Sequence, residues 1–61
     1  MTRVEAYRCL LEGGMIVHSY LGDSPIYLAK GRDIREVHTG FGVNIEFMHN
    51  PKLLDGWSLY E

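Results

Sequence analysis

The chain has 61 residues and a formal net charge of −2, with six lysines and arginines against eight aspartates and glutamates. This length allows a single domain, residues 1–61, and the charge balance excludes the basic surface that duplex nucleic acid binding usually requires. One cysteine, and no apolar run near the ~18 residues of a membrane span, indicate a cytoplasmic protein without a disulfide framework or a membrane partner.

The first predicted element is a helix over residues 2–12. Thr2 and Glu5 have the spacing of a capping box, in which each side chain accepts a hydrogen bond from the other residue's backbone N–H. Apolar residues at helical spacing fall on one face, at Val4, Tyr7, Leu10 and Leu11. Two glycines at 13–14 end the helix, because glycine adopts the left-handed conformation at little cost.

Short strands separated by turn residues are predicted for the rest of the chain. β-Branched and aromatic runs indicate strands at residues 15–21, 26–29, 34–38, 43–48 and 57–60. Alternation in the fourth predicts that Val43, Ile45 and Phe47 face the core. Asn50 and Pro51 predict one helical turn before the last strand, because asparagine caps helices and proline suits the first helical position. The predicted fold is α+β, with an N-terminal helix packed on an antiparallel sheet of about five short strands.

Four segments follow one another in an order and spacing known from a protein family. Leu-Leu-Glu-Gly at 10–13 ends the helix, the strand at 15–21 follows, and Ile-Tyr-Leu at 26–28 forms the next strand. Two leucines, an aspartate, a tryptophan and a glutamate then occur in that order over residues 53–61. This arrangement resembles the small phage proteins of the second Thoeris anti-defence type. The first strand departs from the family because it lacks a basic pair and a tryptophan, and the chain is shorter than typical members.

The resemblance implies a binding function without catalysis. Members of this family sequester cyclic nucleotide signals made by bacterial immune systems, such as cyclised ADP-ribose derivatives, and act as oligomers. By resemblance we expect a phage anti-defence protein of the host cytoplasm that binds such a signal as a dimer or tetramer, without a cofactor. Self-association also suits a chain of this size, since a lone core is marginal. The alternative is a small inhibitor that binds and blocks a host defence protein or another host protein directly.

Aromatic side chains are the candidates for contact with a nucleobase. Tyr20 lies nearest to the position of the family's first-strand tryptophan, and base stacking and simple packing both remain open for it. Tyr27 belongs to the strand that resembles the family's tyrosine-rich strand. Phe41, between two glycines of a predicted loop, suits contact with a ligand or partner, or a plug of the loop. Trp57 is also a candidate, although a core anchor is the favoured interpretation because large aromatics dominate small cores.

Two arginines are the candidate phosphate ligands. Arg32 and Arg35 lie around one predicted turn and present planar donor groups; the alternative is a solvated turn in which Arg35 pairs with Asp33 or Glu36. His18 is predicted as a hydrogen-bond donor in the pocket or as a partly buried strand residue. The predicted ligand-binding set is therefore His18, Tyr20, Tyr27, Arg32, Arg35, Phe41 and Trp57.

Metal binding and catalysis are not expected. The three histidines, at 18, 38 and 49, lack the close spacings of zinc sites, and no cysteine pair is present. Cys9 lies within the predicted helix without an evident neighbouring base, so packing explains it better than nucleophilic catalysis. No glycine-rich loop follows a strand and opens a helix, which a phosphate-binding loop requires.

Overall fold

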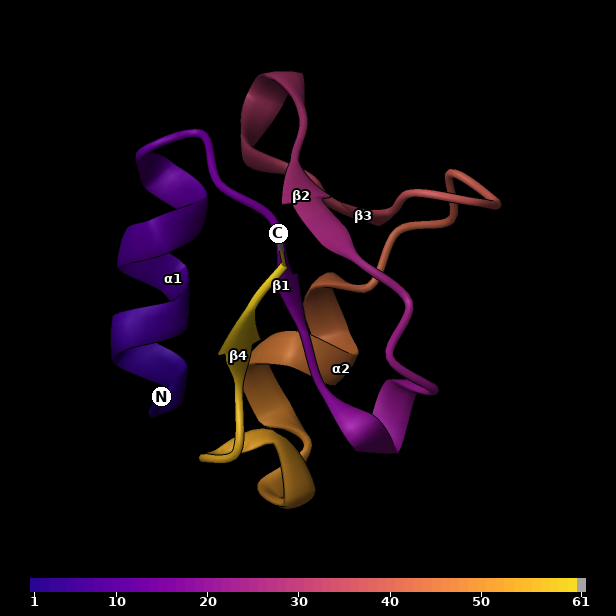
Figure 1. Ribbon diagram of the computed structural model, residues 1–61. Helices are drawn as coiled ribbons and strands as arrows, with labels where there is room; N and C mark the ends of the chain where they lie inside the picture. The colour runs from indigo at the N-terminus through magenta and orange to yellow at the C-terminus, as the bar shows by residue number, and fades with distance from the viewer. Residues whose placement is uncertain (61) are drawn as a thin grey trace.

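The computed structural model describes residues 1–60, which form an α+β fold (Figure 1). The two α-helices are α1 (Arg3–Leu11) and α2 (Asn44–His49). The strands are β1 (Ile16–Val17), β2 (Ile26–Leu28), β3 (Ile34–Glu36) and β4 (Ser58–Leu59). Three short 3-10 turns lie between them: η1 (Ser19–Leu21), η2 (Lys30–Arg32) and η3 (Pro51–Leu53). The strands form one antiparallel sheet in the order β3-β2-β1-β4, which is four strands rather than the predicted five.

The capping box predicted at the start of α1 is confirmed. The Thr2 hydroxyl accepts from the Glu5 N–H at 3.3 Å, and the Glu5 carboxylate accepts from the Thr2 N–H at 2.9 Å. Ala6 and Leu10 are buried, whereas Val4 and Leu11 are more than half exposed. The buried face of α1 is therefore centred between Ala6 and Leu10. It is rotated about the helix axis by about one residue position from the predicted apolar face.

The strand predicted over residues 43–48 is wrong, because the chain turns into α2 there. The Val43 N–H donates to the Ile34 carbonyl at 2.8 Å, as in a strand ladder. The Ile34 N–H, however, donates to a side chain, the Asn44 amide oxygen, at 2.7 Å. The Phe47 N–H then donates back to the Val43 carbonyl at 2.8 Å, which starts the helix. Phe47 is buried, but Ile45 is 76% exposed, so these two residues do not share a face.

The strand predicted over residues 15–21 is too long. It ends at Val17, because the His18 ring accepts the Tyr20 N–H at 3.0 Å and draws the chain into η1. The predicted helical turn at Pro51 is confirmed as η3. There the Asn50 side chain accepts from the Lys52 N–H at 3.0 Å, as expected for a capping asparagine.

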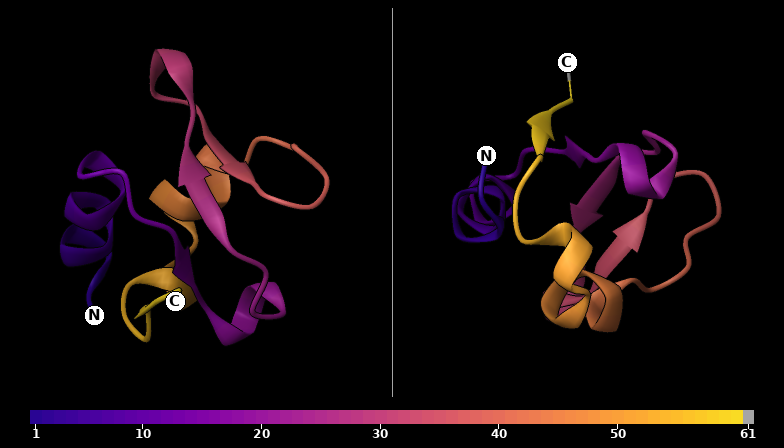
Figure 2. Two further views of the ribbon diagram at one scale, coloured as in Figure 1. Left: turned by 45° about the horizontal axis from the view of Figure 1, so that its top comes forward. Right: turned by 90° about the horizontal axis from the view of Figure 1, so that it is seen from below.

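The core lies on one face of the sheet, between the strands and both helices (Figure 2). Its buried residues come from every layer: Ala6, Leu10, Ile16, Ile26, Ile34, Phe47, Leu53 and Trp57. Trp57 is 2% exposed, its indole N–H donates to the Leu53 carbonyl at 2.7 Å, and its ring lies 5.1 Å from that of Phe47. The interpretation of Trp57 as a core anchor is therefore confirmed. No helix within residues 1–60 is long and apolar enough to cross a membrane.

Candidate functional site

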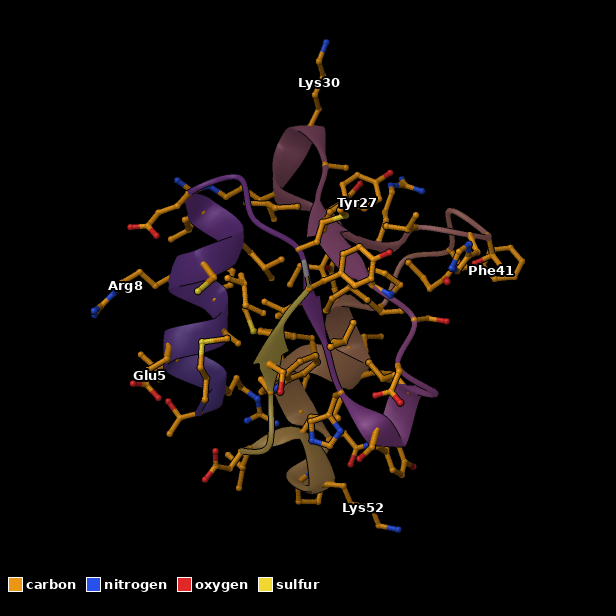
Figure 3. The ribbon with its side chains drawn as sticks, viewed as in Figure 1. Glu5, Arg8, Tyr27, Lys30, Phe41 and Lys52 are labelled. Atoms are coloured by element: carbon orange, nitrogen blue, oxygen red, sulfur yellow. The ribbon has the colours of Figure 1, made fainter. Side chains whose placement is uncertain are left out.

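Within residues 1–60, no helix covers the sheet face opposite the core (Figure 3). Each of β1, β2 and β3 has one buried isoleucine, at 16, 26 and 34. Successive side chains of a strand point to opposite faces, so the residues next to these isoleucines point away from the core. We call this surface the open face; its residues are Met15, Val17, Tyr27, Arg35, Ser58 and Tyr60. All of them are half-buried or exposed. In Figure 3 the open face is turned toward the viewer, with α2 behind the sheet and the labelled Tyr27 over β2.

The strand register sets one row of side chains across the open face. Tyr27 of β2 is paired with Arg35 of β3. Ile16 is paired with Ile26, so the next position in this antiparallel ladder places Met15 beside Tyr27. The Tyr60 N–H donates to the Met15 carbonyl at 2.9 Å, which places Tyr60 on the other side of Met15. The row therefore runs Tyr60, Met15, Tyr27, Arg35. Each residue lies at the distance typical of cross-strand neighbours from the next, so Met15 separates the two phenol rings and the guanidinium lies beside Tyr27.

The two candidate phosphate ligands differ in their surroundings. Arg35 forms an ion pair with Asp33 at 3.3 Å and donates to the Gly40 carbonyl at 2.8 Å. Arg35 therefore pairs with Asp33, as in the alternative to a phosphate ligand. The Arg35 side chain nevertheless remains 42% exposed and has further N–H donors. Arg32 is exposed in η2, where its own φ of 62° and that of Gly31, 75°, form a tight left-handed turn. Only Arg35 belongs to the row on the open face.

Three other predicted site residues lie away from the open face. His18 and Trp57 are packed together in the core, with ring centroids 5.0 Å apart. Tyr20 is 49% exposed in η1, and the Lys52 ammonium lies 5.3 Å from its ring centroid. One face of the Tyr20 ring is therefore already occupied by a cation. The structure brings together Tyr27 with Arg35, and His18 with Trp57, but not all seven residues in one pocket.

Phe41 is presented to solvent by a loop that is held by several internal hydrogen bonds. It is 73% exposed, and its carbonyl accepts from the Glu36 N–H at 2.9 Å. Inside the loop, the Glu36 carboxylate accepts from the Thr39 N–H at 2.6 Å and the Thr39 hydroxyl at 2.8 Å. The Thr39 hydroxyl in turn accepts from the Phe41 N–H at 3.2 Å. These bonds hold the backbone on both sides of Phe41, whose ring is not part of the core.

The same loop provides a pH-dependent prediction. The backbone N–H of Thr39 lowers the pKa of Glu36 below its ordinary value of 4.5, because the bond favours the carboxylate. The contribution of Glu36 to loop order is thus fully present above the ordinary pKa and is lost as the pH falls through the lowered folded value. We expect an NMR titration to give Glu36 a midpoint below 4.5. Thr39→Ala removes the hydroxyl donor but keeps the backbone N–H, so it should move that midpoint only part of the way upward. A midpoint at or above 4.5 in the wild-type chain would contradict this account of the loop.

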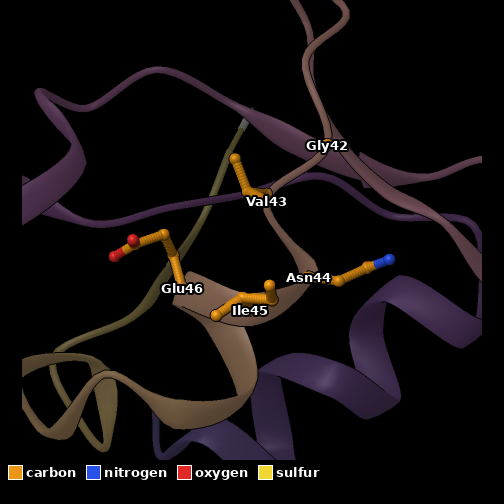
Figure 4. A pocket seen from close by; sticks show the side chains of 5 residues that line it. All are labelled: Gly42, Val43, Asn44, Ile45 and Glu46. Carbon is orange, nitrogen blue, oxygen red and sulfur yellow. The ribbon is translucent and has the colours of Figure 1, made fainter.

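Two shallow hollows lie along α2. One, of about 470 Å³, is lined by Gly42 to Glu46 (Figure 4). The other, of about 280 Å³, is lined by Ile45, Glu46, His49 and Asn50. Ile45 lies between them and is the most exposed large apolar side chain among the described residues. This surface joins the Phe41 loop to α2 and was not predicted, because the sequence alternation had assigned Ile45 to the core.

Neither a metal centre nor a relative was identified. Within residues 1–60, no three histidine, cysteine, aspartate or glutamate side chains are close enough to hold a metal ion together. No protein-family model, curated protein or solved structure matches the chain. Four residues of the open face were not among the predicted site residues: Met15, Val17, Ser58 and Tyr60. The strand alternation around Ile16 is the signal that places Met15 and Val17 on the face away from the core.

Proposed function

We propose that the chain is a binding protein that sequesters a nucleotide-type ligand on its open face without converting it. The observation that supports this proposal is the row in which Tyr27 lies between Met15 and Arg35, with Tyr60 at the far end. Aromatic rings stack on bases with about 1–3 kcal/mol per base, and an exposed guanidinium provides donors for a phosphate. The family resemblance implies the same ligand class, a cyclic nucleotide immune signal, and hence an anti-defence role in an infected cell.

A flat face requires a partner surface to enclose a small ligand. Binding sites usually bury roughly 70% or more of a ligand's surface. One exposed sheet face does not achieve this. We therefore include self-association in the proposal: a second copy covers the ligand on the open face. A small domain also gains stability from such an interface.

The test is a thermal-shift series with cyclic ADP-ribose isomers and cyclic dinucleotides. A ligand at about 100 times its Kd stabilises the folded state by about 2.7 kcal/mol, which for a domain of this size raises Tm by about 10 °C or more. Tyr27→Ala is expected to weaken binding by about 5- to 150-fold, the loss of one stacked base. The matched control is Tyr20→Ala, which removes an equally large ring from η1. Equal losses in both variants, or no shift with any ligand, would contradict a site on the open face.

A second candidate function is direct inhibition of a host protein. The observation that favours it is a pair of strongly exposed apolar side chains four residues apart, Phe41 and Ile45, which are 73% and 76% exposed. A rigid loop that presents an aromatic ring loses little entropy when it docks, and aromatic anchors dominate protein interfaces. Capture of one host protein by the wild-type chain, lost in both Phe41→Ala and Ile45→Ala but retained in Tyr27→Ala, would support this function. Retention in all three variants would exclude this surface.

A further inference from the structure

The His18 ring is hydrogen bonded at both nitrogens to main-chain groups. Nδ1 accepts from the Tyr20 N–H at 3.0 Å, and Nε2 lies 2.8 Å from the carbonyl oxygen of Asp55. A backbone N–H can only donate, and a carbonyl can only accept. Both bonds therefore form with one protonation state alone, the neutral ring that carries its proton on Nε2.

This ring joins two segments that are distant in the sequence. It connects η1, which follows β1, to the turn at Asp55 and Gly56, which precedes β4. The space around it is filled: His18 is 8% exposed, and its ring meets Trp57 at an interplanar angle of 71°. A Cβ atom at Gly56 would lie 3.0 Å from Nε2. The turn before β4 is thus built around the neutral ring.

We propose that His18 is a proton-sensitive latch that holds η1 to the turn before β4 and opens when its ring is protonated. A second proton would sit on Nδ1, opposite the Tyr20 N–H, and two donors cannot share that bond. It would also leave a charge among buried groups, which is costly without a partner. The opened segment accepts the proton in water, so opening becomes more favourable as the pH falls. This inference does not depend on the proposed ligand.

The charged groups around the ring do not provide a partner for the protonated form. They are Asp23, whose backbone N–H donates to the His18 carbonyl, Lys52 in η3, the Asp55 carboxylate and the amino group of Met1. Lys52 lies over Tyr20, and the Asp55 carboxylate is 76% exposed and 4.0 Å from the Met1 amino group. Within the described residues, both hydrogen bonds of the His18 ring go to main-chain atoms. No carboxylate therefore holds a proton on Nδ1.

Hydrogen exchange of the Tyr20 amide tests the latch, because this N–H is bonded to the ring itself. The imidazole of the opened segment takes up a proton as the pH falls, so the Tyr20 protection factor should fall up to about 30-fold between about pH 7.5 and pH 5. The Val43 amide, bonded to the Ile34 carbonyl, is the internal reference and should fall far less. A Tyr20 protection factor that changes only in parallel with that of Val43 would overturn the proposal.

Two further measurements make the test specific to His18. In His18→Gln the side chain does not titrate, so the extra pH dependence of Tyr20 relative to Val43 should disappear; its persistence would overturn the proposal. The nitrogen chemical shifts of the His18 ring in the wild-type chain test the proposal even if this variant does not fold. They should show a neutral ring with an unprotonated Nδ1 at about pH 7.5. A proton on Nδ1 at that pH would overturn it.

Discussion

Replacing Phe47 with alanine is expected to remove a large part of the free energy of unfolding at 25 °C, about 3–5 kcal/mol. The Phe47 side chain is fully buried, and its ring lies 5.1 Å from Trp57 and 6.2 Å from Tyr7 of α1, so it connects α2 to the rest of the core. Truncation of a buried phenylalanine costs about 3–5 kcal/mol. A chain of 61 residues has a total stability of only about 3–9 kcal/mol, at roughly 0.05–0.15 kcal/mol per residue.

Ile45→Ala is the matched control, and urea unfolding followed by Trp57 fluorescence compares the two variants. Ile45 lies two residues before Phe47 but is 76% exposed, so its truncation should change stability by no more than about 0.5 kcal/mol. The pair also distinguishes α2 from a strand, since in a strand both side chains would lie on one face. A loss in Ile45→Ala as large as that in Phe47→Ala would contradict the helix.

Gly56→Ala is expected to destabilise the fold by about 2–5 kcal/mol. Gly56 has φ of +91°, a conformation that costs a residue with a Cβ about 1–2 kcal/mol. The new Cβ would also lie 3.0 Å from Nε2 of His18, so the ring has to shift by a few tenths of an ångström against its bond to the Asp55 carbonyl. Breaking that bond leaves a buried group unsatisfied, which adds about 1–3 kcal/mol.

Gly13→Ala separates the two causes. Gly13 also has φ of +91°, but a Cβ there would meet no atom within 4 Å. Urea unfolding should therefore show the backbone cost alone in Gly13→Ala, and a larger loss in Gly56→Ala. Equal losses would mean that the contact between Gly56 and His18 contributes nothing, which would also weaken the proposed latch.

Local signals predicted the parts of this fold that depend on neighbouring residues. Thr2 and Glu5 predicted the start of α1, and Asn50 with Pro51 predicted η3, because capping is decided within one helical turn. Residues 43–48 could not be assigned in this way. Their apolar positions alternate as in a strand, whereas the structure bonds the Asn44 side chain to Ile34, ten residues earlier, in place of a continued ladder. A tertiary contact of this kind overrides a pattern only six residues long.

The candidate site was predicted in part, by residue type rather than by position. Tyr27 and Arg35 were candidates, but their pairing depends on the register of β2 against β3, which no local pattern specifies. The sequence suggested His18 as a pocket residue or a buried one, and its tautomer followed only from the two main-chain bonds. The exposure of Ile45 near the Phe41 loop could not be predicted, because the sequence pattern assigned Ile45 to the core face of a strand.

The most direct test of the open face is an amide NMR titration of the labelled chain with cyclic ADP-ribose isomers and cyclic dinucleotides. We expect one ligand to shift the amides of the row Tyr60, Met15, Tyr27 and Arg35, and to be recovered intact afterwards. An unchanged spectrum at saturating ligand would contradict nucleotide binding. Shifts confined to Phe41 through Glu46 would contradict the open face as the site and place the binding surface along α2.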